Sequence, residues 1–192
     1  MRGLLWCGVV GGPLFVVVFL LNDRVRDDYD PVRDFVSEAA IGPGGWVQIT
    51  NFVVTGVLMI AFALAVSRAV TAWTGRLVGL FGFGLISAGI FVSDPVPTSA
   101  PTWHGAAHNA VSLVVFVALP AACFTAARWL RTPAWSWYCR AVGVAVPVLF
   151  VLAGGSEEAS GVFQRLCIAI GWTWLATLGL RAFAVTTRAS AE

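Results

Sequence analysis

Six long apolar stretches, separated by short polar segments, decide what this chain can fold into. A helix needs roughly 20 apolar residues to cross the hydrocarbon core of a bilayer. Of the 192 residues, 58% are hydrophobic and only 11% are charged, whereas a soluble domain carries roughly a quarter charged residues. We therefore predict an all-α polytopic membrane bundle that forms one transmembrane domain over residues 1–192. The six predicted spans are residues 4–21, 47–66, 77–92, 106–127, 135–154 and 163–180.

The distribution of charge predicts the orientation of this bundle. All twelve basic residues are arginine. If the N-terminus is cytoplasmic, eight arginines lie inside with one carboxylate, that of Glu192, and nine carboxylates lie outside with four arginines. Cytoplasmic loops are enriched in arginine and lysine, so both termini are predicted to be cytoplasmic. The first apolar run lacks a small-residue cleavage site after it, which favours a retained helix over a signal peptide. We expect a multi-pass protein of a bacterial inner membrane.

Composition also narrows the classes of partner. The net charge of +2 is too small to favour nucleic acid. The four cysteines lie in or beside apolar segments without a Cys-x-x-Cys spacing, which favours small apolar packing residues over disulfides or thiolate zinc sites. The expected partner is a membrane lipid or an isoprenoid small molecule. The sequence does not indicate an oligomeric state.

Titratable side chains gather where the third apolar stretch ends and the fourth begins. Asp94 lies there with His104 and His108, the only two histidines of the chain. Ionisable groups at a membrane boundary indicate a functional site. If a helix begins near Trp103, the two imidazoles lie on one face. We predict catalytic roles for these three residues and for Glu38. Asp94, with a pKa raised at the low-dielectric boundary, would act as a general acid beside an orienting or proton-accepting imidazole.

The same residues allow two other interpretations. Two histidines four apart are typical of metal ligands on a helix, and Asp94 with Glu38 could complete a zinc site. No cofactor is favoured, and zinc is the alternative, with His104, His108 and Asp94 as its ligands. A structural interpretation is also open, in which the histidines cap a helix and Asp94 forms a turn before Pro95.

The first polar segment, residues 28–40, is dense in charge. Its apolar residues follow a helical spacing, which predicts a short amphipathic helix lying on the bundle mouth. Arg33 would then be either paired locally or an anion clamp for the substrate. The face of this predicted helix consists of Val32, Phe35, Val36 and Ala39.

The last polar segment supplies further candidate contacts. Arg165 is placed at membrane depth, where a cation must be paired or face a cavity. Asp94 and Glu158 are its expected partners. Interior tryptophans, Trp172 and Trp174, favour packing, with stabilisation of a cationic centre as the alternative. The predicted substrate-binding residues are Arg33, Trp103, Glu158, Gln164 and Arg165.

Four short motifs arrive in order at successive ends of these stretches. They are Tyr29-Asp-Pro-x-x-Asp34-x-x-Ser-Glu38, Gly89-Ile-Phe-x-x-Asp94, His104-Gly-x-x-His108 and Gly161-x-Phe-Gln-Arg165. With them the chain resembles the bacterial six-helix membrane family catalogued as domain of unknown function 998. Val92-Ser93 stands where that family often has Phe-Pro. The resemblance implies a fold, a topology and one site shared by Asp94, His104, His108 and the Gln164–Arg165 pair, but no established activity.

Three functions are consistent with these features. The first is a membrane enzyme with an outward-facing acid–base pocket for a lipid or isoprenoid, with protonation-initiated terpene cyclisation or isomerisation as its reaction. One alternative is a metal-dependent membrane lipid hydrolase that uses the histidine pair. The other is a non-catalytic transporter subunit or sensor. Both enzymatic hypotheses require the outer loops to converge on one site.

Overall fold

The computed structural model describes residues 2–188, and it is all-α over this range. A one-turn 3-10 helix, η1 (Glu38–Ala40), lies in the loop between α1 and α2. Six helices are each long and apolar enough to cross a membrane, which confirms the six predicted spans. They are α1 (Arg2–Val25), α2 (Trp46–Ala69), α3 (Ala72–Ile90), α4 (Trp103–Ala126), α5 (Pro133–Gly155) and α6 (Ser160–Arg188).

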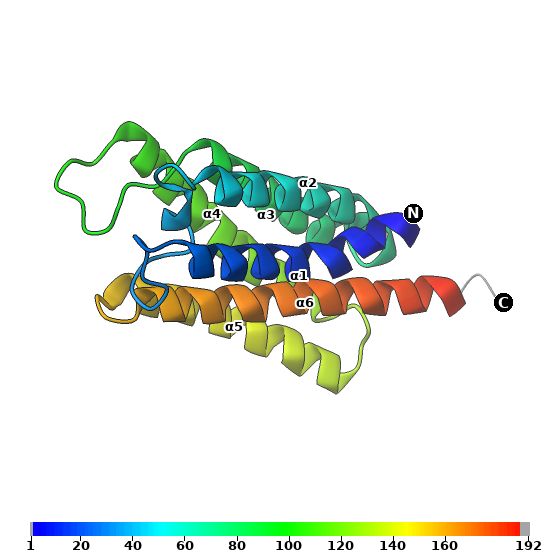
Figure 1. The fold of residues 1–192 in the computed structure, drawn as a ribbon. Helices are drawn as coiled ribbons and strands as arrows, with labels where there is room; N and C mark the ends of the chain where they lie inside the picture. The colour runs from blue at the N-terminus through cyan, green and yellow to red at the C-terminus, as the bar shows by residue number, and fades with distance from the viewer. Residues whose placement is uncertain (1, 189–192) are drawn as a thin grey trace.

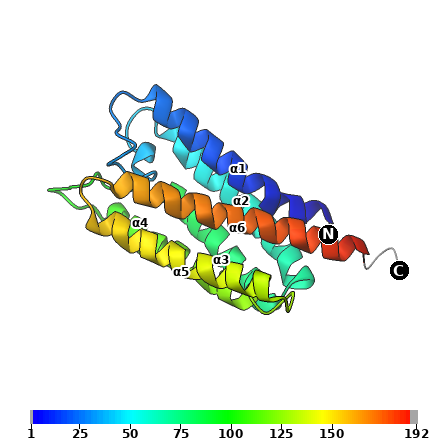
Figure 2. The same ribbon diagram turned by 90° about the horizontal axis from the view of Figure 1, so that it is seen from below.

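The helices form a closed ring in chain order. Each packs against its neighbours in the sequence, and α1 packs against α6 to complete the circle (Figures 1 and 2). Arg2 and α6 meet at one end, where the Arg2 guanidinium donates to the Thr186 carbonyl at 3.2 Å. The loops α1–α2, α3–α4 and α5–α6 lie together at the other end (Figure 1). This end, here called the acidic end, carries nine of the ten carboxylates of the chain.

Helix α3 is the most enclosed of the six. In the most apolar 18-residue segment of α3, 56% of the residues are buried, against 28% in the corresponding segment of α5. A Cβ added to Gly82 would lie 2.8 Å from the Gly56 carbonyl oxygen, so α2 and α3 approach with their backbones almost in contact. Small residues allow such approach in membrane bundles. Gly56 and Gly82 therefore allow α2 and α3 to pack closely along their backbones.

Hydroxyl caps fix where two of the helices begin. Thr71 accepts a hydrogen bond from the Thr74 amide at the start of α3. Thr102 accepts one from the Gly105 amide at the start of α4. Such caps satisfy amides that have no partner inside the helix. Helix α4 consequently begins at Trp103, as the histidine spacing requires.

The predicted amphipathic helix in the first loop is wrong. Residues 31–37 form turns, and only η1 is helical. The Asp30 carboxylate accepts from the Val32 amide, and the Asp34 carboxylate accepts from the Asp30 amide. These local side-chain bonds stabilise turns in place of a helix. Val36 and Ala39 are buried as predicted, but Val32 is exposed.

The cysteines are all free, and three of the four are buried in the bundle. Trp174 is also fully buried, and its indole N–H donates to the Cys139 sulfur at 3.3 Å. The interpretation of the cysteines as packing residues is confirmed, and Trp174 packs with them.

Candidate functional site

A cavity opens inside the bundle towards the acidic end. Its deeper part, here called the inner compartment, has about 60 Å³ of free space and is walled by α1, α2, α3, α4, α6 and the first loop. Its outer part, here called the vestibule, has about 450 Å³ and is bounded by the first two outer loops and by α4, α5 and α6. Both parts are lined by Ser37, His108, Ser112, Phe116 and Gln164.

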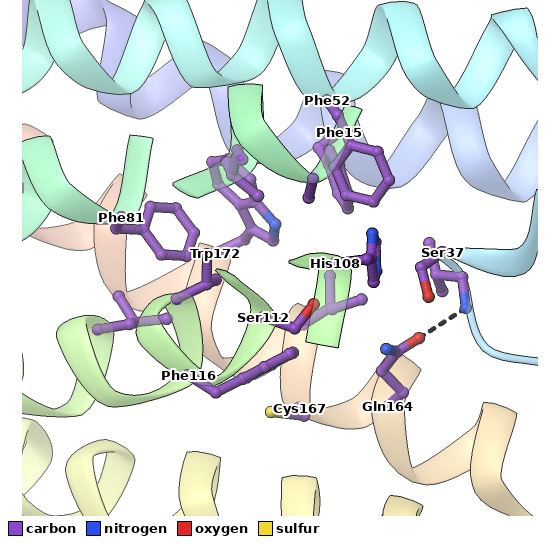
Figure 3. Close-up of a pocket in the computed structure, with 16 residues that line it drawn as sticks. Phe15, Ser37, Phe52, Phe81, His108, Ser112, Phe116, Gln164, Cys167 and Trp172 are labelled. Atoms are coloured by element: carbon purple, nitrogen blue, oxygen red, sulfur yellow. Dashed lines mark hydrogen bonds between the residues drawn. The ribbon is translucent and has the colours of Figure 1, made fainter. Parts of the chain in front are cut away.

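Aromatic rings form one side of the inner compartment (Figure 3). Trp172 stacks on Phe15 with ring centroids 5.2 Å apart and meets Phe81 edge-on at 5.5 Å. Phe52 contacts Phe15 at 5.5 Å. Such ring pairs have preferred geometries, which gives this wall a defined shape. Of the two interior tryptophans in the last span, Trp172 lines the cavity.

The vestibule borders the surface that faces lipid. Its wall includes Phe150, Val151 and Gly154 of α5 opposite Asn109 and Phe116 of α4. The Val151 side chain is 70% exposed on the outside of the bundle. The vestibule wall therefore extends to the exposed outer surface of the bundle between α4 and α5.

His108 lies where the two parts of the cavity join. The residue is only 3% exposed, and its Nδ1 lies 2.7 Å from the Phe91 carbonyl oxygen. A carbonyl oxygen only accepts, so Nδ1 carries the proton in this bond. In the neutral imidazole, Nε2 then holds a lone pair. The fold therefore presents His108 as a buried proton acceptor with a fixed tautomer.

His104 does not share this site. It is exposed, its Nδ1 lies 3.2 Å from the Thr102 hydroxyl oxygen, and its ring meets that of Trp103 at 4.5 Å. Trp103 is itself 71% exposed. Neither residue lines the cavity, because the first turn of α4 rises into the loop region before the helix enters the bundle core. The structure therefore supports no role for His104 in catalysis or for Trp103 in substrate binding.

The candidate zinc ligands do not form one group: Asp94 and His104 lie beside the Thr102 hydroxyl, and His108 bonds the end of α3. Within residues 2–188, no three side chains of His, Cys, Asp or Glu lie close enough together to hold a metal ion. The His108 ring is hydrogen-bonded to the Phe91 carbonyl at the end of α3, and the Asp94 carboxylate is hydrogen-bonded to Thr102. The described residues therefore do not fit a zinc site.

Asp94 closes the second outer loop onto α4. One carboxylate oxygen accepts from the Thr102 amide at 2.8 Å and the other from the Thr102 hydroxyl at 2.7 Å. These bonds stabilise the charged form and lower the pKa of Asp94. A Cβ on Gly105 would lie 2.0 Å from this carboxylate, so glycine is needed beneath it. The predicted rise in the pKa of Asp94 is wrong, whereas its role as a general acid stays a prediction.

Glu38 is the vestibule carboxyl whose pKa is raised. It is 8% exposed, and burial raises its pKa despite bonds that favour the charged form. One oxygen accepts from the Phe35 amide at 2.8 Å and the other from the Val96 amide at 2.7 Å. Glu38 thus ties the first outer loop to the second. These two loops converge on the cavity, as the enzymatic hypotheses require.

The raised pKa predicts how stability depends on pH. The folded protein holds the Glu38 proton more tightly than the unfolded chain does. This contribution to stability is complete below the ordinary pKa of glutamate, about 4.3, and is lost as pH rises through the higher folded pKa. The melting temperature of wild type should fall across that window, whereas Glu38→Gln should lack this slope and Glu157→Gln, altered at an exposed residue, should retain it. Equal slopes in wild type and Glu38→Gln would contradict this account.

Arg165 is paired with Asp23 and with neither predicted partner. Its Nε and one terminal nitrogen bond the two Asp23 oxygens at 3.1 and 3.0 Å. The two side chains are 14% and 6% exposed. Asp23 lies in the last turn of α1, which packs along α6, whereas Glu158 is exposed and Asp94 is bound to Thr102. The prediction that Arg165 must be paired is correct, but both proposed partners are wrong.

The remaining Arg165 donors hold the first outer loop. They reach the Tyr29 hydroxyl at 2.6 Å and the carbonyls of Pro31 and Asp34 at 2.7 and 3.0 Å. Burial raises the pKa of Tyr29, which stays a neutral phenol and donates to the Phe35 carbonyl. With its guanidinium nitrogens occupied in this way, Arg165 acts as an internal clamp. Its predicted contact with substrate is not supported.

The start of α6 is built into the same clamp. The amides of Gly161 and Val162 donate to the carbonyls of Arg33 and Val32, and the Ser160 hydroxyl donates to the Arg33 carbonyl. A Cβ on Gly161 would lie 2.5 Å from two loop carbonyl oxygens, so only glycine allows this contact. Arg33 contributes its backbone, while its exposed side chain and that of Glu158 line a separate outer groove. Neither side chain reaches the cavity.

Gln164 is the predicted substrate contact that does line the cavity. Its side-chain oxygen accepts from the Val36 amide at 2.6 Å, and the residue is nearly buried (Figure 3). Several lining residues were missed from the sequence. On α4 a signal was present, because the lining residues recur at helical spacing from His108. They are His108, Ser112, Val115, Phe116 and Leu119.

Comparison with known proteins gives a family for this chain. Residues 9–181 match the model of the family described as "Protein of unknown function (DUF998)". The chain belongs to this family. No curated protein and no solved structure matches it. In this DUF998 protein, the motif segments around Tyr29 and Arg165 form the loop clamp. Of the residues that the resemblance assigns to one site, His108 and Gln164 share the inner compartment, and Asp94 lies in the vestibule wall.

Proposed function

We propose that this protein is a membrane enzyme that binds the apolar chain of a lipid or isoprenoid and moves a proton through His108. The observation that carries the proposal is a buried imidazole whose Nδ1 donates to a backbone carbonyl, placed between an aromatic compartment and a vestibule whose wall includes exposed residues of α5. A volume of about 450 Å³ lies within the usual range of ~300–1,000 Å³ for ligand sites.

The geometry favours isomerisation over a reaction begun by a strong acid. Nε2 of His108 can accept a proton from a carbon that lies between a carbonyl group and a double bond of the chain, and the imidazolium can return a proton to the far carbon of that double bond. The double bond moves, and no atom is gained or lost. Asp94 is held as a carboxylate, and both oxygens of Glu38 bond backbone amides. Neither carboxyl is therefore well placed to start a cyclisation by protonating an alkene.

A non-catalytic sensor or transporter subunit is the second candidate. It is favoured by the structural use of Asp94, Glu38 and Arg165, each of which fastens a loop. Such a protein would bind the same apolar chain without exchanging a proton with it. Binding thus tests both candidates, and proton exchange separates them.

Blocking the junction of the cavity should weaken binding. Ser112 lines both parts of the cavity, and phenylalanine at this position would fill the passage between them. Leu113, the next residue of α4, is exposed on the lipid-facing side, so Leu113→Phe is a matched control. We expect Ser112→Phe to weaken binding of a prenol chain in lipid nanodiscs by about tenfold or more, that is about 1.4 kcal/mol, and Leu113→Phe to leave it unchanged. Equal binding by both variants would contradict the proposed site.

We further propose that the acidic end faces outward from a bacterial inner membrane and that both termini are cytoplasmic. Eight of the twelve arginines belong to the opposite end, which supports this orientation. A membrane-impermeant maleimide applied to intact cells should label Glu157→Cys but not Arg128→Cys, both of which replace exposed residues. Lysed cells should show label at both. The unaltered chain is the control, and label at Arg128→Cys alone in intact cells would reverse the orientation.

A further inference from the structure

We infer that the vestibule selects apolar chains with an uncharged, hydroxyl-bearing head group and rejects chains that carry phosphate. This inference rests on the proposed function and names the substrate class of the same cavity. It follows from the charges around the vestibule, from the partners that those charges already have, and from the uncharged polar groups at the junction.

No cation is placed to receive a phosphate. The described residues that line the vestibule include the carboxyl groups of Glu38 and Asp94 and no arginine. His108, where the two parts of the cavity join, is present as the neutral imidazole described above. Two nearby arginines are already engaged. Arg26 bonds Asp28 and the carbonyls of Ala39 and Ile41, and Arg165 bonds Asp23. A phosphate brought into the vestibule would be desolvated without a partner, which is costly.

The net negative charge of the acidic end also disfavours binding of an anion. The acidic end carries nine carboxylates and four arginines, a formal charge of 4 − 9 = −5. The third arginine side chain near the mouth, that of Arg33, lines the neighbouring groove beside Asp34, Glu157 and Glu158. A cavity entrance lined by negative charge lowers the local concentration of anionic ligands.

A cationic head group is not favoured either. Both oxygens of Asp94 accept hydrogen bonds from Thr102, and both oxygens of Glu38 accept from backbone amides. An ion pair with a bound amine would compete with the bonds that hold the two loops in place. The carboxylates therefore shape the vestibule and exclude anions without offering a free acceptor to a cation.

Uncharged polar groups do face the cavity where a head group would lie. Ser37, Ser112 and the Gln164 amide line the junction around His108. Ser93 also lines the vestibule, and its buried hydroxyl has no hydrogen-bond partner among the described residues. A hydroxyl both donates and accepts, so it can satisfy Nε2 of His108 and a neighbouring donor together. An alcohol at the end of an apolar chain matches this set.

Three probes with the same short prenyl chain test the inference: the alcohol, the diphosphate and the primary amine. Binding to the full chain in zwitterionic nanodiscs should be tightest for the alcohol, about tenfold or more weaker for the diphosphate, and no tighter for the amine. A diphosphate or amine that binds more tightly than the alcohol would overturn the inference while leaving the proposed function in place. Failure of all three to bind would overturn the proposed function and the inference with it.

A gain of binding provides a second test. Thr98 is an exposed loop residue that lines the vestibule. Thr98→Arg should supply the missing cation and strengthen diphosphate binding by about tenfold or more, while Thr98→Gln should not. Alcohol binding should be unchanged in both variants. Equal diphosphate binding by the two variants would contradict the placement of the head group in the vestibule.

Discussion

Replacing Arg165 with alanine should destabilise the folded bundle by about 3–5 kcal/mol, because it leaves a buried carboxylate without its partner. Asp23 is 6% exposed, and Arg165 provides both of the hydrogen bonds that reach its oxygens. The same substitution releases Tyr29 and two carbonyls of the first outer loop. Thermal unfolding in detergent and protease cleavage in residues 26–45 would measure the two effects.

Two further variants separate charge from geometry at this clamp. Arg165→Lys keeps a cation near Asp23 but loses the planar fork that reaches several acceptors, so its stability should fall between those of wild type and Arg165→Ala. Arg33→Ala removes an exposed arginine side chain from the same loop and should change stability by less than about 0.5 kcal/mol. If Arg33→Ala destabilised the protein as much as Arg165→Ala, the clamp would not be what holds the loop.

Replacing His108 with glutamine should slow exchange between solvent and the carbonyl-activated proton of a bound prenyl ketone by about 10²–10⁴-fold. The glutamine amide can still donate to the Phe91 carbonyl, but it offers no comparable proton acceptor to the ligand. Deuterium uptake into the bound chain, followed by mass spectrometry, reports the transfer whatever the final product is. Binding measured in parallel should stay close to wild type, because the apolar walls are unchanged.

His104→Gln is the matched control for this substitution. It makes the same chemical change four residues away on α4, at an exposed position outside the cavity. Its exchange rate should equal that of wild type. An equal loss in the two variants would indicate a structural effect at the start of α4, and undiminished exchange in His108→Gln would favour the non-catalytic candidate.

The fold was predictable because hydropathy is a local property. Runs of apolar residues gave all six helices, and Trp103 was recognisable as the start of α4. The requirement for a partner at Arg165 was predictable for the same reason, since a cation at membrane depth needs one. The identity of that partner was not predictable, because Asp23 lies 142 positions away from Arg165 in the sequence.

The site was predictable only in part, since its chemistry depends on hydrogen bonds that form on folding. Asp94 has a lowered pKa because Thr102, eight residues later, supplies both of its donors. His104 and His108 share a spacing but not an environment, because only the second turn of α4 is enclosed. The aromatic side of the inner compartment joins residues of α1, α2, α3 and α6, which no local pattern brings together.

The central claim is that an apolar chain enters the bundle and ends beside His108. Photo-crosslinking with a diazirine-tagged prenol, followed by peptide mapping, tests it most directly. We predict label on lining residues of α4 and α6 such as Ser112 and Ile168, and loss of that label with excess unlabelled prenol. Label confined to exposed residues outside the cavity such as Leu113 and Val117, unaffected by competitor, would contradict the account.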